Sequence, residues 1–418
     1  MKTLTTVLVS LIAGMLLGCA WKACRPSQVP EYYSEPLQSV RERAAAVGSA
    51  ARKQGKRVVL ITGAAGFVGF HTALQLHAEG DVVLGIDNYN HYYDVTLKRT
   101  RAALLRRAGM TTLFEGDVCD GELVQSILTH GRVTNVIHLA AQAGVRYSLK
   151  KPLAYVEANV RCFVQILESV HAANNSIPIT YASSSSVYGT NKVIPFSEKH
   201  QVDSQASLYG ATKKSNENIA HVYNSLHGLK LTGLRFFTVY GPLGRPDMAY
   251  FGFTQAILAG KRITEFRNAD GTELMRDFTY ISDIVSGVIA AMRLEAKLEV
   301  FNLGNTRPEK VSKLIGLLES GLGRRANVSQ APISAGDVPM TYADVSHARA
   351  LLGYSPQVSL ASGVRRFLQW YSAYYGISLP NEMTPTHRGG AELREKYDIA
   401  GKGRGEPKPR KLRTLSQE

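Results

Sequence analysis

The stretch KRVVLITGAAGFVGFHTALQLHAEGDVVLGIDNYN, residues 56–90, contains two short β-branched runs on either side of a helical pattern. The first run, Val58–Thr62, ends at a glycine, and the second, Val82–Ile86, is followed by Asp87. Between them, apolar residues recur at the spacing of one helix face. The stretch therefore predicts a strand, a helix and a second, parallel strand, which together form one βαβ unit.

Three glycines, Gly63, Gly66 and Gly69, lie between the first strand and the helix at the spacing G-x-x-G-x-x-G. They permit a tight turn and let a pyrophosphate approach the helix N-terminus, whose free N–H groups and dipole favour an anion. A glycine triplet also occurs in simple structural turns, but here Asp87 follows eighteen residues after Gly69, as in dinucleotide-binding units. A carboxylate at that place accepts hydrogen bonds from both ribose hydroxyls and repels a 2′-phosphate. The pattern predicts an NAD site and favours NAD over NADP.

The alternation of strand and helix continues along the chain. Further strands are expected in TTLFEGDVCD (111–120), where the strand ends in Asp117 and Val118, and in NVIHLAAQAG (135–144), IPITYASSSSVYG (177–189) and KLTGLRFFTVYG (230–241). This period predicts an α/β fold with a Rossmann-like doubly wound parallel sheet, in which ligands gather at the carboxyl ends of the strands. From about residue 245 the alternation becomes irregular, which predicts a smaller C-terminal substrate-binding domain.

The segment SLYGATKKSNE carries Tyr209 and Lys213 four residues apart, and this spacing places both side chains on one helix face. A free tyrosine ionises near pH ~10, so it is a poor base at neutral pH unless a cation stabilises the phenolate. Lys213 and a positive nicotinamide ring would supply that charge. A Y-x-x-x-K pair alone is common by chance. After a glycine loop, it predicts a catalytic base and its partner.

Four serines, Ser183 to Ser186, stand at the end of an expected buried strand, before Val187-Tyr188-Gly189. Such a run is compatible with an ordinary turn. Its hydroxyls are also placed to bond the reacting oxygen of a substrate.

Composition sets broad limits on the class of protein. The 418 residues are 44% hydrophobic and 20% charged, as in an ordinary globular protein, and the formal charge is +15. Residues 401–418 hold six Lys or Arg against two Glu, which predicts a disordered basic tail.

The four cysteines, Cys19, Cys24, Cys119 and Cys162, show no spacing typical of zinc or a disulfide framework. We therefore expect no metal site, and neither fold nor chemistry is expected to depend on the cysteines. Nothing in the sequence indicates a nucleic-acid partner.

The N-terminus carries nineteen residues without charge, Thr3 to Trp21, between Lys2 and Lys22. As a helix rising about 1.5 Å per residue, they would just span a hydrocarbon core roughly 30 Å thick. The segment predicts a single-pass membrane anchor, with a Golgi or other secretory-pathway membrane as the expected location. Two alternatives stay open: a cleaved signal peptide, and a bacterial lipoprotein signal, because LLGC has that form.

The expected domain organisation has five parts. They are an anchor or signal segment (1–21), a stem (22–55), a Rossmann domain with the Tyr-Lys pair (56–240), a mainly substrate-binding domain (241–378) and a basic tail (379–418). Removal of residues 1–55 is therefore expected to leave a soluble, active enzyme.

Several motifs occur in the order and spacing of one known family. They are the glycine loop, HLAAQAGVRYS, ASSSSVYG, YGATK, LRFFTVYGPLGRPDMA, RDFTYISDIV, FNLGN and GDVPMTYAD. On these motifs, residues 57–371 resemble the extended short-chain dehydrogenase/reductase family (NAD-dependent epimerases and dehydratases), and within it the UDP-glucuronate 4-epimerases.

The resemblance implies a role for many single residues. Tyr209 would be the catalytic base, Lys213 its electrostatic partner and Ser184 the hydroxyl that bonds sugar O4, with Ser185 and Ser186 beside it. The implied NAD-binding residues are Gly63, Gly66, Phe67, Val68, Gly69, Asp87, Asn88, Asp117, Val118, Ala140, Ala141, Gln142, Asn159, Tyr209 and Lys213. Arg276 would face the diphosphate of UDP, Asp337 its ribose, and Thr238 the sugar.

The resemblance also implies a mechanism: oxidation at C4 by tightly bound NAD, rotation of the 4-keto sugar, and return of the hydride to its other face. A homodimer is a family-level expectation. The segment GPLGRPDMAY (241–250) places Arg245 on a stiff turn after the strand that carries Thr238. Because a guanidinium matches a carboxylate in bidentate geometry, Arg245 is the candidate contact for the uronate, although an exposed turn arginine is the plainer interpretation.

Four alternatives remain in view. A UDP-glucose/UDP-galactose 4-epimerase would use the same catalytic pair, and a UDP-glucuronate decarboxylase would share the substrate and the first step. A 4,6-dehydratase is disfavoured because Ser185-Ser186 stand where that branch places Asp-Glu. A catalytically silent NAD-binding scaffold is disfavoured because it needs no tuned base. The sequence leaves open the strictness for uronate, the membrane and orientation of the anchor, the oligomeric state and the role of the basic tail.

Overall fold

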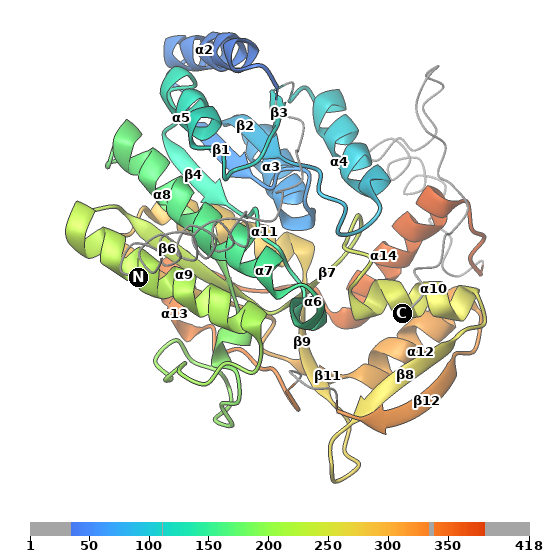
Figure 1. Ribbon diagram of the computed structural model, residues 1–418. Coiled ribbons are helices and arrows are strands. Elements are labelled where there is room, and N and C mark those ends of the chain that lie inside the picture. Colours follow the sequence, from blue (N-terminus) through green and yellow to red (C-terminus); the bar gives the residue numbers. More distant parts are fainter. Residues whose placement is uncertain (1–34, 111, 334–337, 381–418) are drawn as a thin grey trace, which may run out of the picture. The chain divides into compact units, whose positions relative to one another are not determined.

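The computed structural model in Figure 1 describes residues 35–110, 112–333 and 338–380, which belong to one compact unit. Its main sheet contains seven parallel strands, in the order β10-β6-β5-β4-β1-β2-β3. They are β1 (Val58–Thr62), β2 (Val82–Asp87), β3 (Leu113–Glu115), β4 (Asn135–His138), β5 (Ile179–Ser184), β6 (Leu231–Phe236) and β10 (Leu298–Leu303). Strand order reverses between β1 and β4, so the predicted Rossmann-like doubly wound sheet is confirmed.

Helices cover both faces of this sheet. Since neighbouring side chains of a strand point to opposite faces, β1 sends Val58 and Leu60 into one buried cluster and Val59 and Ile61 into the other. The first face carries α2 (Leu37–Lys53), α5 (Gly121–His130), α8 (Cys162–Ala173) and part of α9 (Leu208–His227). The other carries α3 (Phe67–Ala78), α4 (Val95–Arg107) and α11 (Ile281–Leu294). Phe70, which follows the last loop glycine, is fully buried against the sheet.

A smaller part of the unit surrounds two short sheets. One has the order β11-β9-β7 and the other pairs β12 with β8. Their strands are β7 (Thr238–Tyr240), β8 (Arg262–Arg267), β9 (Met275–Tyr280), β11 (Pro308–Lys310) and β12 (Asn327–Pro332), with helices α10 (Ala249–Leu258), α12 (Val311–Leu322), α13 (Ser346–Leu352) and α14 (Leu360–Tyr375). The chain returns to the main sheet with α11 and β10, so the segment 241–378 is not one continuous substrate domain.

Two strand boundaries differ from the expectation. The third strand ends at Glu115, before Asp117 and Val118, and the expected sixth strand divides into β6 and β7, which belong to different sheets. The predicted anchor (Thr3 to Trp21), most of the tail (381–418) and Asp337 lie outside the described residues. Among the residues that are described, no helix is both long enough and apolar enough to cross a membrane.

The expected stem is wrong for residues 35–55, because helix α2 packs on the folded unit beside α5 (Figure 1). Val40, Ala44 and Ala51 are buried in the same cluster as the apolar face of α5. Gly48 lies so close to α5 that a Cβ atom there would stand 2.6 Å from the carbonyl oxygen of Gly131. Before the helix, the backbone N–H of Glu35 donates to the carbonyl oxygen of Glu115, so this segment is also bonded to the end of β3. The buried face is built from small residues, which gives it little apolar signal in the sequence.

We predict that a chain that starts at residue 56 is destabilised by at least about 3 kcal/mol, because it exposes the apolar surface that Val40 and its neighbours cover. A chain that starts at residue 35 should keep full stability. Thermal unfolding of the two fragments measures the difference. Gly48→Leu should lower the melting temperature in the longer fragment, whereas Ser49→Leu, at an exposed neighbouring position, should not. Equal melting temperatures for the two fragments would contradict the structural role of α2.

Two of the cysteines are joined, which the sequence did not predict. Cys119, in the turn after β3, forms a disulfide with Cys162 at the start of α8, and their Cα atoms are 4.5 Å apart. The bond closes a loop between residues 43 positions apart in the chain. The bond contradicts the expectation that the cysteines form no disulfide, and it connects two segments of the predicted NAD site.

Candidate active site

The glycine loop has the geometry that a dinucleotide needs. Gly63 has φ +69°, and a Cβ atom on it would lie 2.9 Å from the backbone nitrogen of Ala140. A Cβ atom on Gly69 would lie 2.1 Å from the carbonyl oxygen of Gly63, so no larger residue fits there. Helix α3 begins after Gly66 with no side chain capping it and no acidic residue in its first turn. Its first amides, from Phe67 onward, thus remain free for an anion, and the loop fits a pyrophosphate.

Asp87 lies at the end of β2 and is almost fully buried. One carboxylate oxygen accepts from the backbone N–H of Ala65 at 3.0 Å, and the other from that of Tyr89 at 2.8 Å. Each oxygen keeps a further lone pair, so the carboxylate can still accept from ribose hydroxyls. Asn88 donates to Asp117 at 2.8 Å, which brings these two predicted residues together beside Val118.

A second group of predicted NAD residues is built around a π-helical turn, η1 (Val156–Arg161), between α7 (Pro152–Tyr155) and α8. Asn159 in this turn bonds both backbone groups of Gln142, at 2.7 and 3.0 Å, and also donates to Thr212 on α9. π turns are frequent at functional sites, because they re-aim side chains within a helix. Asn159 therefore fixes the loop 140–142 after β4, with Ala140 and Ala141, against the helix that carries Tyr209.

The predicted catalytic residues come together where α9 meets the end of β5. Ser207 caps α9 by accepting from the N–H of Gly210, and a Cβ atom on Gly210 would lie 2.5 Å from the carbonyl oxygen of Ser186. This close approach brings Tyr209 within hydrogen-bonding reach of Ser184. Lys213 donates to the carbonyl oxygen of Ala182 at 2.8 Å.

Burial dominates the electrostatics of this pair. It raises the pKa of Tyr209 above its ordinary value, while the hydrogen bond with Ser184 and the charge of Arg245 act in the opposite direction. Burial lowers the pKa of Lys213 to about 8, so the ammonium still carries its charge at neutral pH. Perturbed pKa values on two side chains one helical turn apart are typical of acid–base sites.

The serine run adopts a tight turn, η2 (Ser185–Tyr188), directly after β5. Ser184 caps this turn, because its hydroxyl accepts from the N–H of Ser186 at 3.2 Å and bonds the Ser186 hydroxyl at the same distance. The run is thus both a turn and a cluster of hydroxyls at the carboxyl end of the sheet.

Arg245 does not stand free on its turn. Its guanidinium forms a two-pronged ion pair with Asp247, which includes a 3.0 Å bond from Nε, and Tyr92 donates to the same carboxylate at 3.1 Å. Both charges of the pair act on the pKa of Tyr209, Arg245 lowering it and Asp247 raising it. Arg245 therefore belongs to the same site as Tyr209. Asp247 and Tyr92 are members of the site that the sequence did not single out.

The turn that carries Arg245 is held by a fully buried arginine. Arg101 on α4 donates from Nε and Nη2 to the carbonyl oxygen of Leu243, at 2.9 and 2.7 Å, and from Nη2 also to that of Gly244. Leu243 has a positive φ of 55°, which is uncommon for a non-glycine residue. Nη1 of Arg101 also donates to the carbonyl oxygen of Ala65 and to the hydroxyl of Tyr93. No sequence signal marks Arg101, because the turn that it holds lies more than 140 positions away.

The predicted UDP residues occupy the smaller sheets. Thr238 opens β7 and pairs with Phe278 of β9, two positions after Arg276. The guanidinium of Arg276 donates to the carbonyl oxygens of Met275 and Pro339, at 2.9 and 3.2 Å. Thr238 and Arg276 thus lie on neighbouring strands, and nothing is described for Asp337.

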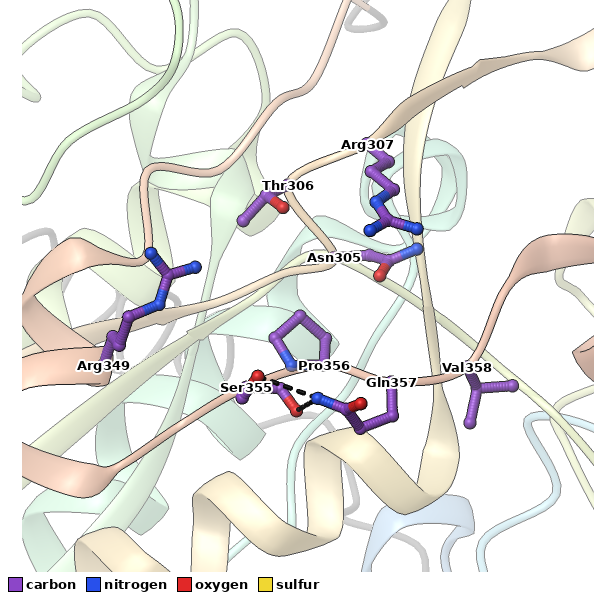
Figure 2. A pocket seen from close by; sticks show the side chains of 8 residues that line it. All are labelled: Asn305, Thr306, Arg307, Arg349, Ser355, Pro356, Gln357 and Val358. Carbon is purple, nitrogen blue, oxygen red and sulfur yellow. Dashed lines mark hydrogen bonds between the residues drawn. The ribbon is translucent and has the colours of Figure 1, made fainter.

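A polar hollow of about 210 Å³ lies elsewhere on this part of the unit (Figure 2). None of the predicted site residues lines it. Its walls are Asn305, Thr306, Arg307, Arg349, Ser355, Pro356, Gln357 and Val358. The hollow is therefore not the candidate active site, which lies at the carboxyl ends of the parallel strands and on α9.

Comparison with known proteins places these features in a family. Residues 60–367 match the family model described as GDP-mannose 4,6 dehydratase. UDP-glucuronate 4-epimerase 6 of Arabidopsis thaliana is 51% identical over 344 residues, which are 79% of this chain and 74% of the relative. UDP-glucuronate 4-epimerase 4 of the same plant is 51% identical over 332 residues, 76% of each chain.

Solved structures agree with these relatives. UDP-glucuronic acid 4-epimerase from Bacillus cereus, in complex with UDP-glucuronic acid and NAD, has a TM-score of 0.70 and 34% identity, and the match covers 76% of this chain and 100% of that chain. UDP-glucose 4-epimerase from Thermotoga maritima, with UDP-glucose, has a TM-score of 0.66 and 29% identity, over 76% and 99% of the two chains. The chain therefore belongs to the NAD-dependent epimerase/dehydratase family of extended short-chain dehydrogenases/reductases and, within it, to the UDP-glucuronate 4-epimerases.

Proposed function

We infer that this chain is an NAD-dependent enzyme that interconverts UDP-glucuronate and UDP-galacturonate by inverting carbon 4 of the sugar. One observation carries the inference. Tyr209, Lys213 and Ser184 meet beside the glycine loop at the carboxyl end of the parallel sheet, in a chain 51% identical to a curated 4-epimerase.

In the proposed mechanism, Tyr209 takes the proton from sugar O4, and Ser184 orients that oxygen by a hydrogen bond. Burial disfavours the Tyr209 phenolate, and the Ser184 hydroxyl and the charge of Arg245 oppose this effect. We propose that the ammonium of Lys213, one helical turn away, adds to the stabilisation of the phenolate. The backbone bond from Lys213 to Ala182 keeps that ammonium at the strand end. Tyr209 later returns the proton to O4 on the inverted carbon.

NAD, when bound, supplies the acceptor and the donor of the C4 hydride. The glycine loop and the first amides of α3 hold its pyrophosphate, and Asp87 receives a ribose. The sugar turns about its diphosphate linkage while carbon 4 is a ketone. We propose that Arg276 and Asp337 hold the UDP part during this rotation, and that Thr238 lines the sugar pocket.

For the uronate carboxylate, we propose Arg245 as the contact. Two observations support this choice. The planar guanidinium can bind a carboxylate with two hydrogen bonds, and its charge lowers the pKa of Tyr209, so the two side chains lie close to one site. In the structure, Asp247 accepts from Nε and from one terminal nitrogen of the guanidinium. An internal carboxylate at this place indicates that the surroundings of Arg245 accept a carboxylate.

The substrate is tested by incubating the protein separately with UDP-glucuronate, UDP-glucose and UDP-xylose, and identifying the products by proton NMR. UDP-galacturonate from the first incubation supports the proposed function. Turnover of a neutral sugar alone would favour the UDP-glucose 4-epimerase that the Thermotoga relative exemplifies. Formation of UDP-xylose from UDP-glucuronate would identify a decarboxylase.

The lowered pKa of Lys213 makes a prediction about stability. The folded protein holds this lysine at a pKa of about 8 against 10.5 ordinarily, so between these pH values the unfolded chain binds more protons. The wild type should therefore gain stability, relative to Lys213→Met, as pH rises from about 8 to about 10.5, by up to about 3 kcal/mol. Denaturant unfolding of both proteins at pH 7.5 and 10 measures this difference in the free energy of unfolding. If the difference between wild type and Lys213→Met is the same at both pH values, the pKa of Lys213 is not lowered in the folded protein.

We propose a homodimer that forms through α9 and the helix beside it. Leu153 on α7 and Leu226 on α9 are 76% and 72% exposed, and Val156 and Val222 are exposed near them in sequence. Exposed apolar side chains on neighbouring helices favour a protein interface. Leu226→Asp is expected to shift the molar mass measured by light scattering from dimer to monomer. Val328→Asp, on the exposed strand β12, is the control and should leave the mass unchanged.

We also propose that residues 3–21 anchor the chain in a membrane of the secretory pathway, such as the Golgi, with a cleaved signal peptide as the alternative. The support is the uncharged run itself. Alkaline extraction of membranes from cells that express the full chain, followed by N-terminal sequencing, separates the two. A retained Thr3 to Trp21 segment in the membrane pellet supports the anchor, and a soluble protein that begins after it refutes it.

A further inference from the structure

Helix α9 meets the last residues of β5 through three side chains, each one helical turn after the previous one. Residues four apart lie on the same face of a helix, so positions 209, 213 and 217 face the strand together. The contacts are Tyr209 with Ser184, Lys213 with the carbonyl oxygen of Ala182 at 2.8 Å, and Glu217 with the hydroxyl of Ser183 at 2.7 Å. The first two belong to the catalytic centre, whereas the proposed mechanism makes no use of the third.

Glu217 is held by a buried arginine on the next strand. Arg235 of β6 donates from Nε and Nη2 to the two carboxylate oxygens, at 2.9 and 2.8 Å, and both side chains are only 4% exposed. In the register of β5 with β6, Arg235 lies directly across from Ser183. Burial would raise the pKa of Glu217, but the bonds and charge of Arg235, with the Ser183 hydroxyl, hold it below its ordinary value. The carboxylate is therefore ionised.

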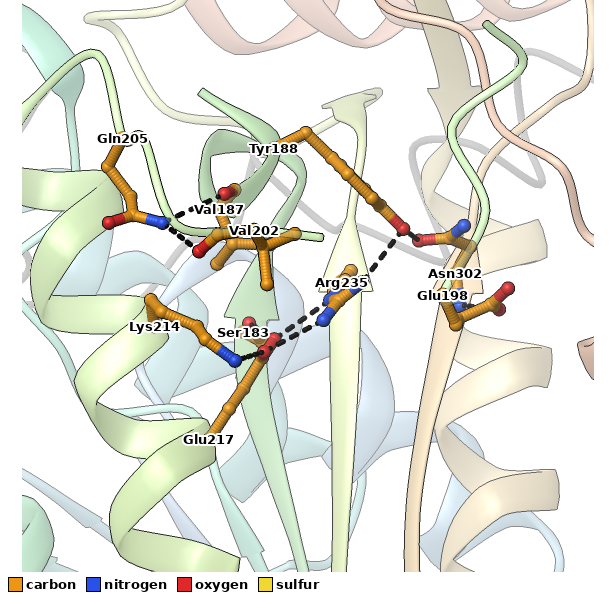
Figure 3. A network of polar contacts seen from close by, with 10 residues as sticks. All are labelled: Ser183, Val187, Tyr188, Glu198, Val202, Gln205, Lys214, Glu217, Arg235 and Asn302. Atoms are coloured by element: carbon orange, nitrogen blue, oxygen red, sulfur yellow. Dashed lines mark hydrogen bonds and ion pairs between the residues drawn. The ribbon is translucent and has the colours of Figure 1, made fainter. Parts of the chain in front are cut away.

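The pair is part of a longer buried network (Figure 3). The third nitrogen of Arg235 donates to the hydroxyl of Tyr188 at 3.0 Å, and Tyr188 donates to Asn302 on β10 at 2.7 Å. Asn302 is fully buried and in turn donates to the carbonyl oxygens of Phe196 and Asp344. Lys214 adds a second cation, 3.6 Å from Glu217. The network fixes Glu217 relative to three strands of the main sheet.

A buried ion pair gains little stability over an apolar pair of the same volume, because both charges lose their hydration. Its bonds are directional, however, and they define one position of α9 along β5. We propose that Glu217, held by Arg235, is a positioning residue for the epimerisation: it fixes Ser183 and thereby the place of Ser184 relative to Tyr209 and Lys213. This proposal rests on the proposed function and adds a residue to its machinery.

Two variants test the role, one at each end of the hydrogen bond between Glu217 and Ser183. Glu217→Gln keeps the shape but leaves the Arg235 charge without a counter-ion. Ser183→Ala keeps the ion pair and removes only its bond to the strand. Because small displacements of reacting groups can cost about a hundredfold in rate, we expect kcat for UDP-glucuronate to fall about ten- to a hundredfold in Glu217→Gln and about three- to tenfold in Ser183→Ala. KM and the amount of NAD that copurifies should change by less than about threefold in both.

Glu265→Gln is the control, since it removes the charge of another buried glutamate, which pairs with Arg267 on β8, outside the main sheet. Glu265 is 5% exposed and Arg267 is 20% exposed. It should lower the melting temperature and leave kcat unchanged. The Glu217→Gln/Ser183→Ala double variant should lose no more kcat than Glu217→Gln alone, because both changes break one connection.

Each outcome decides between explanations. If Ser183→Ala keeps wild-type kcat, or if the losses appear in KM or in bound NAD, the positioning role is wrong, whether or not Glu217→Gln folds. If Glu265→Gln loses as much kcat as Glu217→Gln, the effect is general destabilisation and the proposal also fails. The wild type, assayed beside them, tests the proposed function separately: no product from it refutes that function and this proposal together.

Discussion

Replacing Tyr209 by phenylalanine is expected to lower kcat for UDP-glucuronate by about a thousandfold or more, while NAD still copurifies with the protein. The phenol oxygen is the proposed acceptor of the O4 proton, and general acid–base groups contribute about 10² to 10⁴ in rate. The ring itself packs edge-on against Tyr155, with centroids 6.1 Å apart, and phenylalanine keeps that contact. The measurement is a progress curve by proton NMR, with bound nucleotide quantified after denaturation.

Tyr155→Phe is the matched control for this variant. Its hydroxyl donates to the carbonyl oxygen of Ala143 at 2.8 Å and takes no part in the proposed chemistry. It should cost about 1 kcal/mol of stability and leave kcat within about threefold of the wild type. Near-normal turnover by Tyr209→Phe, or an equal loss in Tyr155→Phe, would contradict the role of Tyr209 as the base.

The parts of this molecule that were predictable from sequence depend on local pattern. The glycine loop, Asp87 and the Y-x-x-x-K pair act within one βαβ unit or one helical turn, so their spacing carries the geometry. The doubly wound parallel sheet was predictable from the repeated alternation of strand and helix. The family resemblance then supplied residues that no local pattern marks, such as Asn159.

Helix α2 shows why another part was missed. Its sequence is charged, and its buried face consists of Val40, Ala44, Gly48 and Ala51, which together have little apolar surface. Such a face is stable only because α5 offers a complementary surface at close distance, as the contact between Gly48 and Gly131 shows. Close fit between two distant segments leaves no periodic signal in either of them.

Long-range polar contacts were missed for a related reason. Arg101 and Arg235 bond residues that only the tertiary structure brings close, and so does Asp247 in its contact with Tyr92. The disulfide of Cys119 and Cys162 is of the same kind, since a helix and a loop after a strand meet there. A charged residue in a sequence looks like a surface residue until its partner is known.

The second large effect concerns the substrate. Arg245→Ala is expected to lower kcat/KM for UDP-glucuronate by a factor of about 10² or more, since loss of one partner of a desolvated charge pair costs about 2 to 5 kcal/mol. Bound NAD should be unaffected, because the Arg245 side chain bonds Asp247 and is not one of the predicted NAD-binding residues. Initial rates with UDP-glucuronate and UDP-glucose measure the selectivity.

Arg245→Ala also changes the charge near Tyr209, and this effect must be distinguished from the loss of the uronate contact. Without Arg245, the carboxylate of Asp247 keeps its bond to Tyr92 but loses its counter-ion, and its charge raises the pKa of Tyr209 further. That effect would slow every substrate. Arg245→Ala combined with Asp247→Asn removes the stranded charge, so the double variant should recover its rate with any neutral sugar that the wild type accepts, but not with UDP-glucuronate. Asp247→Asn alone should keep the uronate activity, because it frees the guanidinium. If the double variant recovers activity on UDP-glucuronate as well, Arg245 acts on Tyr209 through its charge, and another residue holds the uronate.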